Sequence, residues 1–374
     1  MKYKVLYICK KIGEEPTGGT RRNLGTINFL KNTESLQCSV LTESSLQIDN
    51  VEVLQSKEII SQRKVTLSPK SFHSRKTIKI IKKDHFSFLP MGFLKIVFRK
   101  FEILYCTCPT YTNVQIGFLY KIFHPKSQLI VEYRDLYSFN PSYKENLLIK
   151  IARYFEIKML KKADKIITTT NGMKNKLNKY VDIKKIEVVH NYISESDYKE
   201  GMGLESLDLN SEYYNIGYIG TLNTGRDPKI FLELLNMTVE GKLIMLHIAG
   251  SSNLQNEYIL NNSNEECHNR IKFYGIVDRM TSLKIMKSMD SLFVSVNPDY
   301  EMSEGYGIPG KLFDYIAMKN NLMTDAHTFK KLCGEICIEK TLTMGKYIQF
   351  RAYKRNFLDE ELTQIFNRES LLKS

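Results

Sequence analysis

Short apolar runs rich in β-branched residues alternate with helix-like stretches through the first half of the chain. Continuous or alternating apolar runs predict strands, and a 3.6-residue apolar period predicts helices. The alternation therefore indicates a parallel sheet covered by helices. The expected strands are Tyr3–Cys9, Cys38–Leu41, Ile103–Cys106, Leu129–Tyr133, Lys165–Thr169 and Ile186–His190. The expected helices lie near Thr20–Leu30, Asn113–Phe123, Glu145–Lys162 and Met173–Lys179.

One of these helices, Glu145–Lys162, has a well-defined apolar face. Leu148, Ile151, Phe155 and Met159 recur at helical spacing and are expected to face one way.

Residues 193–213 turn polar and acidic and lose their periodicity, which predicts a linker. It would join a first domain, 1–192, to a second, 214–350, and residues 351–374 would hold a helix that packs back on the first domain. Two successive α/β domains imply a crevice between strand ends of both. The second series of strands is expected at Asn215–Ile219, Leu243–Ala249, Ile271–Tyr274 and Ser291–Val296. Its helices are expected at Pro228–Met237, Met280–Met289 and Gly310–Met318.

Composition agrees with a globular chain of two domains. The 374 residues are 43% hydrophobic and 25% charged, which excludes a largely disordered or collagen-like protein. No run approaches the roughly 18 apolar residues of a membrane-spanning helix, and the N-terminus lacks the apolar region of a signal peptide. We therefore expect a soluble, intracellular protein.

The net charge of +13 is concentrated in one segment, residues 61–100, which holds eleven basic residues and one acid, Asp84. Apolar residues are interleaved with its later charges, as suits an anionic membrane surface. The alternative is a solvated helix face above core residues. Nucleic acid is not expected as a partner, because no nucleic-acid-binding motif accompanies the charge.

No metal site is expected. The seven cysteines include Cys106 and Cys108, and Cys333 and Cys337, but no pair has CxxC spacing, and the seven histidines form no HxH or HExxH motif. We expect these cysteines to be buried, reduced thiols.

Glycines follow several of the expected strands, where they would let a ligand approach the backbone or simply form turns. Gly18 and Gly19 precede a helix beginning at Thr20, a suitable place for a diphosphate, with Arg21 and Arg22 nearby. The second domain repeats this plan, with Arg226 placed to reach a diphosphate or to remain solvated. The corresponding residues there are Gly220, Thr221, Gly250, Gly275 and Val277.

The most specific stretch is SEGYGIPGKLFDYIAMKN, in which Pro309 and Gly310 form a turn before a helix. Lys311 and Asp314 then share one face of its first turn. The lysine would hold a phosphate while the carboxylate accepts ribose or sugar hydroxyls. The alternative is a surface ion pair.

The order of motifs resembles the retaining, nucleotide-sugar-dependent glycosyltransferases of family 4. The motifs are GGTRR at 18–22, VEYRDLY at 131–137, ADKIITTTNGM at 163–173, VVHN at 188–191, GTLNTGRDP at 220–228 and GIPGKLFDYIA at 307–317. The resemblance implies the GT-B fold, an α/β fold of two Rossmann-like domains whose parallel sheets face a crevice. It also implies a nucleoside diphosphate sugar donor bound by the second domain, an acceptor bound by the first, and no metal or other cofactor.

Carried over residue by residue, Arg226 takes the place of the family's phosphate-binding lysine, and Thr221 stands where many members have arginine. Asp314 matches the second acid of the family's Glu-x7-Glu pair. The first falls at Tyr306, with Glu304 two residues away. The family's active-site histidine is replaced by the region around Cys108.

On the acceptor side, Arg134 and Asp135 follow an apolar strand. Asp135 is expected to orient the acceptor hydroxyl or accept its proton, unless it is a helix cap. Asp135, Arg226 and Lys311 are thus the expected catalytic residues.

These observations predict an enzyme that transfers a sugar from a nucleoside diphosphate sugar to a hydroxyl of a polysaccharide or lipid-linked glycan, with retention, at the inner face of the membrane. The alternatives are a catalytically degenerate accessory subunit and a nucleotide-sugar epimerase.

Overall fold

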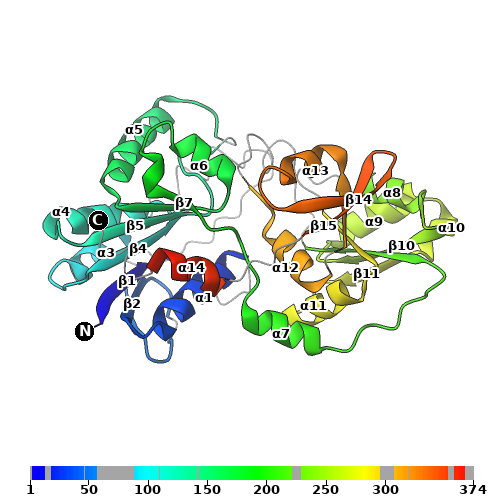
Figure 1. Cartoon of the computed structure of the whole chain (residues 1–374), viewed down its shortest axis with the longest axis horizontal. Coiled ribbons are helices and arrows are strands. Elements are labelled where there is room, and N and C mark those ends of the chain that lie inside the picture. Colours follow the sequence, from blue (N-terminus) through cyan, green and yellow to red (C-terminus); the bar gives the residue numbers. More distant parts are fainter. Residues whose placement is uncertain are drawn as a thin grey trace. The chain divides into compact units, whose positions relative to one another are not determined.

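The computed structural model describes the chain except for residues 1, 13–17, 46, 57–87, 109, 141–142, 221–228, 295–306, 320, 353–357 and 367–374. The chain forms two compact units (Figure 1). The first comprises Met1–His190 and Glu361–Ser374, and the second comprises Asn191–Glu360.

The first unit is built on a seven-stranded sheet in which all neighbouring strands are parallel, in the order β3-β2-β1-β4-β5-β6-β7. The order reverses between β1 and β4, so the chain crosses over there, and ligands of such sheets bind at strand ends beside this point. The strands are β1 (Tyr3–Ile8), β2 (Leu36–Thr42), β3 (Glu52–Gln55), β4 (Ile103–Cys108), β5 (Gln128–Tyr133), β6 (Lys165–Thr168) and β7 (Ile186–Val188).

Helices cover this sheet because its central strands are buried on both faces; all six residues of β4 are buried. The last helix of the chain contributes to this layer from Glu361 onward: the ring of Phe366 stacks on Tyr105 of β4 at 6.0 Å and lies 5.9 Å from Phe29. The helices are α1 (Gly18–Asn32), α3 (Phe88–Ile96), α4 (Thr112–Phe123), α5 (Leu147–Lys162), α6 (Asn171–Leu177), the short 3-10 helix η2 (Ile183–Lys185) and α14 (Leu358–Phe366).

The second unit has a sheet of order β11-β10-β8-β12-β13-β15-β14, with β9 paired to β10. Its first five strands pair in parallel, whereas β15 is antiparallel to both β13 and β14. The strands are β8 (Tyr214–Ile219), β9 (Thr238–Val239), β10 (Lys242–Ala249), β11 (Ile271–Gly275), β12 (Ser291–Phe293), β13 (Leu322–Asp325), β14 (Ile338–Met344) and β15 (Tyr347–Ala352).

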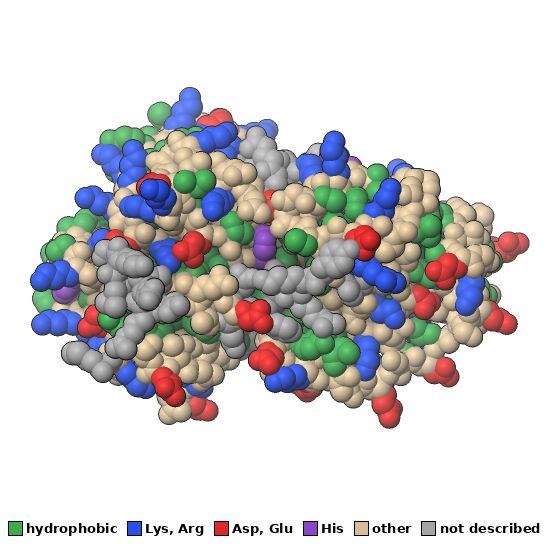
Figure 2. All heavy atoms as spheres, in the orientation of Figure 1, with side chains coloured by type: hydrophobic (Ala, Val, Ile, Leu, Met, Phe, Trp, Pro, Cys, Tyr) green, Lys and Arg blue, Asp and Glu red, His purple; other side chains and the backbone are tan. Residues whose placement is uncertain are grey.

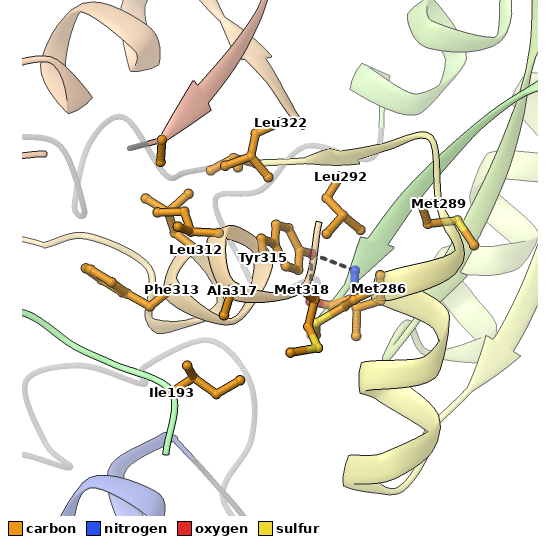
Figure 3. Close-up of a cluster of buried hydrophobic side chains, with 14 of the residues drawn as sticks. Ile193, Met286, Met289, Leu292, Leu312, Phe313, Tyr315, Ala317, Met318 and Leu322 are labelled. Atoms are coloured by element: carbon orange, nitrogen blue, oxygen red, sulfur yellow. Dashed lines mark hydrogen bonds between the residues drawn. The ribbon is translucent and has the colours of Figure 1, made fainter. Parts of the chain in front are cut away.

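The helices of this unit pack around a hydrophobic core that includes Leu312, Phe313 and residues 315–318 (Figure 3). They are α7 (Glu195–Gly203), α8 (Lys229–Leu235), α9 (Asn253–Asn262), α10 (Glu265–His268), α11 (Arg279–Ser288), α12 (Gly310–Met318) and α13 (Ala326–Leu332).

The segment 193–213, expected as a linker, belongs to the second unit and contains α7. Ser194 caps this helix by accepting a hydrogen bond from the Asp197 N–H at 3.1 Å. Ile193 is buried in the core of the unit, and Gly201 lies so close to Met318 that an added Cβ would be 3.0 Å from its Sδ. The polar, acidic composition gave no sign of this short helix, which is stabilised by the Ser194 cap and by the close packing of Gly201.

One other expectation differs from the structure. Cys333 and Cys337 are exposed, whereas the other five cysteines are buried as expected, and all seven are free thiols. On α5, the four residues expected to face one way do lie on one side of the helix, but Leu148, Ile151 and Phe155 are exposed and only Met159 is buried. Within the described part of the chain, no helix is long and apolar enough to cross a membrane.

Candidate functional site

Three glycines of the second unit lie where neighbouring parallel strands end. Gly220 follows β8, Gly250 follows β10 and Gly275 ends β11, and each has a positive φ, of +140°, +90° and +65° respectively. The Gly250 N–H donates to the Gly275 carbonyl at 2.7 Å. A Cβ on Gly250 would be 2.9 Å from the backbone of Gly220, so only glycine fits there. These strand ends thus present backbone without side chains.

Lys311, in the first turn of α12, lies against the first of these glycines. Its Nζ is 3.5 Å from the centroid of the Tyr218 ring, a cation–π contact, and 3.6 Å from the position a Gly220 Cβ would take. Absence of that Cβ therefore leaves room for the lysine over the end of β8. The geometry thus brings Lys311 and Gly220 together.

Helix α12 is held to the end of β8 by a buried tyrosine in its middle turn. The Tyr315 hydroxyl donates to the Ile219 carbonyl at 2.9 Å and accepts from the Ile219 N–H at 2.7 Å (Figure 3). Pro309 is the N-cap residue and makes no side-chain cap. The N–H groups of this first turn, with the positive end of the helix dipole, therefore lie near Lys311 and favour an anion.

Asp314 is placed differently from the expected ribose-binding acid. It is 4% exposed, and its two carboxylate oxygens accept hydrogen bonds from Arg279 at 2.9 and 2.8 Å. Arg279 also donates to Asp197 on α7 at 2.8 Å. Burial acts to lower the pKa of Arg279, but the hydrogen bonds and charges of the two aspartates outweigh it and raise that pKa. Asp314 therefore joins α12 to α11 and α7.

Several expected site residues lie outside the described residues: Thr221, Arg226, Glu304 and Tyr306, as well as most of the basic segment. Gly18 and Gly19 were expected in the loop before a helix that begins at Thr20, but α1 already begins at Gly18, so both glycines belong to its first turn. Val277 is half-buried and packs against the core around α12. Gly310 opens α12 and is exposed.

In the first unit, Arg134 and Asp135 follow β5. The Arg134 Nε donates to the Cys108 carbonyl at 2.9 Å, which ties the end of β5 to the end of β4. Asp135 is exposed, and its charge, after burial, contributes to the raised pKa of Tyr143. Asp135 is thus an exposed carboxylate at the end of β5.

Arg22, expected beside a diphosphate, is used inside the first unit. It is 3% exposed and its Nε donates to Glu132 at 2.8 Å. Its remaining nitrogens donate to the carbonyls of His190 and Val189 at 2.9 and 3.1 Å. Arg22 is therefore a bridge between α1, β5 and the end of β7, because a buried guanidinium requires such partners.

A buried polar cluster at the same strand ends was not predicted. Asn23 accepts a hydrogen bond from the Tyr7 hydroxyl at 2.9 Å and donates to Cys9, while Asn113 accepts from the Lys10 N–H at 3.2 Å. Burial raises the pKa of Cys9 to about 12, so this thiol stays protonated. Their positions in the sequence could have indicated this cluster, because both asparagines lie near the start of a helix that follows a strand.

Across the described ranges, no group of three or more His, Cys, Asp or Glu side chains is placed to bind a metal ion. No protein-family model and no curated protein matches the sequence.

Solved structures are similar in fold. Sucrose-phosphate synthase from Thermosynechococcus elongatus matches with a TM-score of 0.59 and 11% identity over 99% of this chain and 91% of that one. HepE from Anabaena, solved in complex with UDP-glucose, matches with a TM-score of 0.50 and 11% identity over 84% and 78%. A putative UDP-N-acetylglucosamine 2-epimerase from Listeria monocytogenes matches with a TM-score of 0.51 and 13% identity over 99% and 90%. The chain therefore has the GT-B fold of these neighbours.

Proposed function

We propose that this protein is a glycosyltransferase that moves a sugar from a nucleoside diphosphate sugar to a hydroxyl of a polysaccharide or lipid-linked glycan, with retention of configuration. The observation that carries the proposal is Lys311, whose ammonium lies beside Gly220 at the start of α12. A cation, a helix N-terminus and glycine backbone at strand ends together suit a diphosphate.

In this reaction negative charge develops on the departing diphosphate. Lys311 and the N–H groups at the start of α12 would stabilise that charge, and Gly220, Gly250 and Gly275 would admit the nucleotide to the backbone. Arg226 would add a second cation and Thr221 a neighbouring contact. Because α12 and the strand ends fix the positions of Lys311 and the three glycines, these residues would need no rearrangement as the charge forms.

The proposed ribose contact at Asp314 has to coexist with Arg279. Each carboxylate oxygen has a second lone pair, so Asp314 would accept a ribose hydroxyl while still holding the guanidinium. Glu304 or Tyr306 would stand for the first acid of the family pair. Asp135, exposed at the end of β5, would orient the acceptor hydroxyl or take its proton, with Arg134 beside it.

We further propose that the protein works without a metal, on the inner face of a membrane that it reaches through the basic segment 61–100. Eleven basic residues in that segment favour anionic lipid, at about 1 kcal/mol for each residue engaged. Such attachment would bring the enzyme to a lipid-linked acceptor.

Transfer is tested by incubating the protein with a panel of nucleoside diphosphate sugars, beginning with UDP-sugars, because HepE was solved with UDP-glucose and the Listeria neighbour is a putative UDP-N-acetylglucosamine 2-epimerase. Release of the nucleoside diphosphate, with the product's anomeric configuration read by NMR, is the expected result. Donor binding without turnover would instead identify a degenerate accessory subunit.

Isomerisation of a free UDP-sugar without transfer would instead identify an epimerase, the function ascribed to the Listeria neighbour.

Lys311→Met should lower turnover by about one to three decades, as is typical when a preorganised charge-stabilising donor is lost. Lys272→Met is the matched control, because Lys272 also lies over a tyrosine ring, that of Tyr274, at 5.2 Å.

A further inference from the structure

Helix α5 of the first unit turns an apolar face to solvent. Five of its side chains are 46% to 73% exposed, although all are large and hydrophobic. At 100° per residue they fall within an arc of about 120°. They are Leu147, Leu148, Ile151, Tyr154 and Phe155, here called the α5 face.

The opposite side of α5 is the one that packs on the unit. Glu156, Met159 and Leu160 are buried there. The Glu156 carboxylate accepts hydrogen bonds from the Tyr133 hydroxyl at 2.7 Å and the Ser138 N–H at 2.9 Å, which fixes the rotation of the helix. The side of α5 that packs on the unit is thus fixed, and the apolar α5 face points to solvent.

The solvent-accessible charges on α5 are all positive. Its single acid is the buried Glu156, whereas its basic residues are exposed or half-buried. Lys158 lies along the apolar arc, with Nζ 4.4 Å from the Tyr154 ring centroid. Arg153 forms an ion pair with the Glu145 carboxylate. The basic residues are Lys150, Arg153, Lys158, Lys161 and Lys162.

Figure 2 shows hydrophobic and basic side chains together over α5, at the upper left. The neighbouring helices extend the pattern: α4 packs against both α3 and α5. Leu94, Phe98, Ile122 and Phe123 on and beside α3 and α4 are 58% to 92% exposed.

We propose that the α5 face docks the first unit on an anionic lipid bilayer. A helix with exposed leucine, isoleucine and aromatic side chains and with lysines along and beside them suits the boundary between headgroups and acyl chains. The lysine stems can lie along the apolar surface while their ammonium groups reach the lipid phosphates. The helix of 16 residues would lie flat over about 24 Å of membrane.

A protein partner would have to match the same lysines with acidic groups, whereas anionic lipid supplies them everywhere. The α5 face shares no residue with the basic segment 61–100, so the two can be changed independently by mutation. Vesicle binding needs neither donor nor acceptor. The test of this inference is therefore independent of the proposed transfer reaction.

The test is co-sedimentation of the full chain with phosphatidylcholine vesicles and with vesicles containing about one third phosphatidylglycerol. The wild type should bind the anionic vesicles at least tenfold more tightly than the neutral ones. The triple variant Leu148→Ser, Ile151→Ser, Phe155→Ser should lose at least tenfold in that binding. Leu254→Ser with Ile276→Ser, which changes side chains 78% and 94% exposed in the second unit, should leave it unchanged.

Because the chain contains no tryptophan, a single introduced one reports on its own surroundings. Phe155→Trp should give fluorescence that shifts to the blue with anionic vesicles, whereas Ile276→Trp should not shift. Wild-type binding retained by the folded triple variant would overturn the proposal. So would equal binding to both kinds of vesicle, or a lipid-free dimer that the triple variant dissociates.

Discussion

Arg279 and Asp314 form a bidentate ion pair in the second unit, with N–O distances of 2.9 and 2.8 Å. Asp314 follows Lys311 by three residues on α12, so the partner that holds Asp314 also fixes the helix that carries the lysine. The same guanidinium reaches Asp197 of α7. The geometry of the proposed donor site thus depends on a residue outside its motif.

Arg279→Met should therefore destabilise the second unit by about 3 kcal/mol, because it leaves the Asp314 carboxylate buried without its partner. Urea unfolding followed by circular dichroism measures the loss. Lys199→Met is the control: Lys199 pairs with Glu195 on the surface, 72% exposed, and its loss should cost under about 0.5 kcal/mol. Equal effects of the two changes would contradict the bridging role of Arg279.

The stability of the second unit should fall as the pH drops from 7 to 4, in part because of His247. Burial, helped by Lys272 and opposed by Asp290, lowers the pKa of His247 to about 4. Its Nε2 donates to Asn215 Oδ1 and its Nδ1 accepts from the Tyr274 hydroxyl, both at 2.9 Å, since Asn215 Oδ1 can only accept.

The unfolded chain binds the proton near pH 6.5 and the folded chain only near 4, so stability present above 6.5 is lost below it, by about 3 kcal/mol. His247→Gln removes this titration. The difference in unfolding free energy between wild type and variant should shrink as the pH falls. A difference that stays constant from pH 7 to 4.5 would show that His247 does not titrate in this way.

Gly117 should not tolerate a methyl group. On α4, an added Cβ would lie 2.4 Å from Cys106 Sγ and 2.8 Å from Leu129, so helix and sheet would have to separate. Gly117→Ala should destabilise the first unit by about 1 to 3 kcal/mol. Gly203→Ala, at the end of α7 with nothing within 4 Å of the new Cβ, should be neutral or stabilising by about 0.5 kcal/mol. Thermal melts of both variants decide the matter.

Asp135→Asn should reduce sugar transfer while leaving donor affinity nearly intact, because Asp135 lies in the first unit and the proposed diphosphate contacts lie in the second. Transfer rate and nucleotide affinity are measured on the same preparation. A parallel fall in both would place Asp135 on the donor side or in the fold.

The sequence pattern predicted the parallel strands of both sheets except β3 and β13, because strands buried on both faces leave long apolar runs, as in Leu104–Cys108. It did not predict the antiparallel pair β14 and β15, because five of the seven residues of β14 are exposed and the turn depends on Gly345 alone. Periodicity grouped Leu148, Ile151 and Phe155 on one face of α5, yet it carries no information on whether that face meets the core or the solvent.

In the candidate site, too, the sequence predicted local features but not the contacts between distant residues. Local rules located Lys311 at a helix start and Gly220 at a strand end, since both are encoded by neighbours in sequence. The partners of Asp314 and Arg22 were not predictable, because Arg279 is 35 residues from Asp314 and Glu132 is 110 residues from Arg22. Which side chain neutralises a buried charge is decided by the packing of distant elements, and no spacing rule reports it.

Calorimetric titration of nucleoside diphosphates, beginning with UDP, into wild type, Lys311→Met and Lys272→Met tests the central claim most directly. The account predicts that the wild type binds at least one nucleoside diphosphate, that Lys311→Met weakens binding by about tenfold or more, as for loss of a charge-assisted contact, and that Lys272→Met leaves it unchanged. Thermal melts should show all three proteins folded. Absence of binding across the nucleotide panel, or equal affinity of wild type and folded Lys311→Met, would contradict the assignment of a diphosphate to the start of α12.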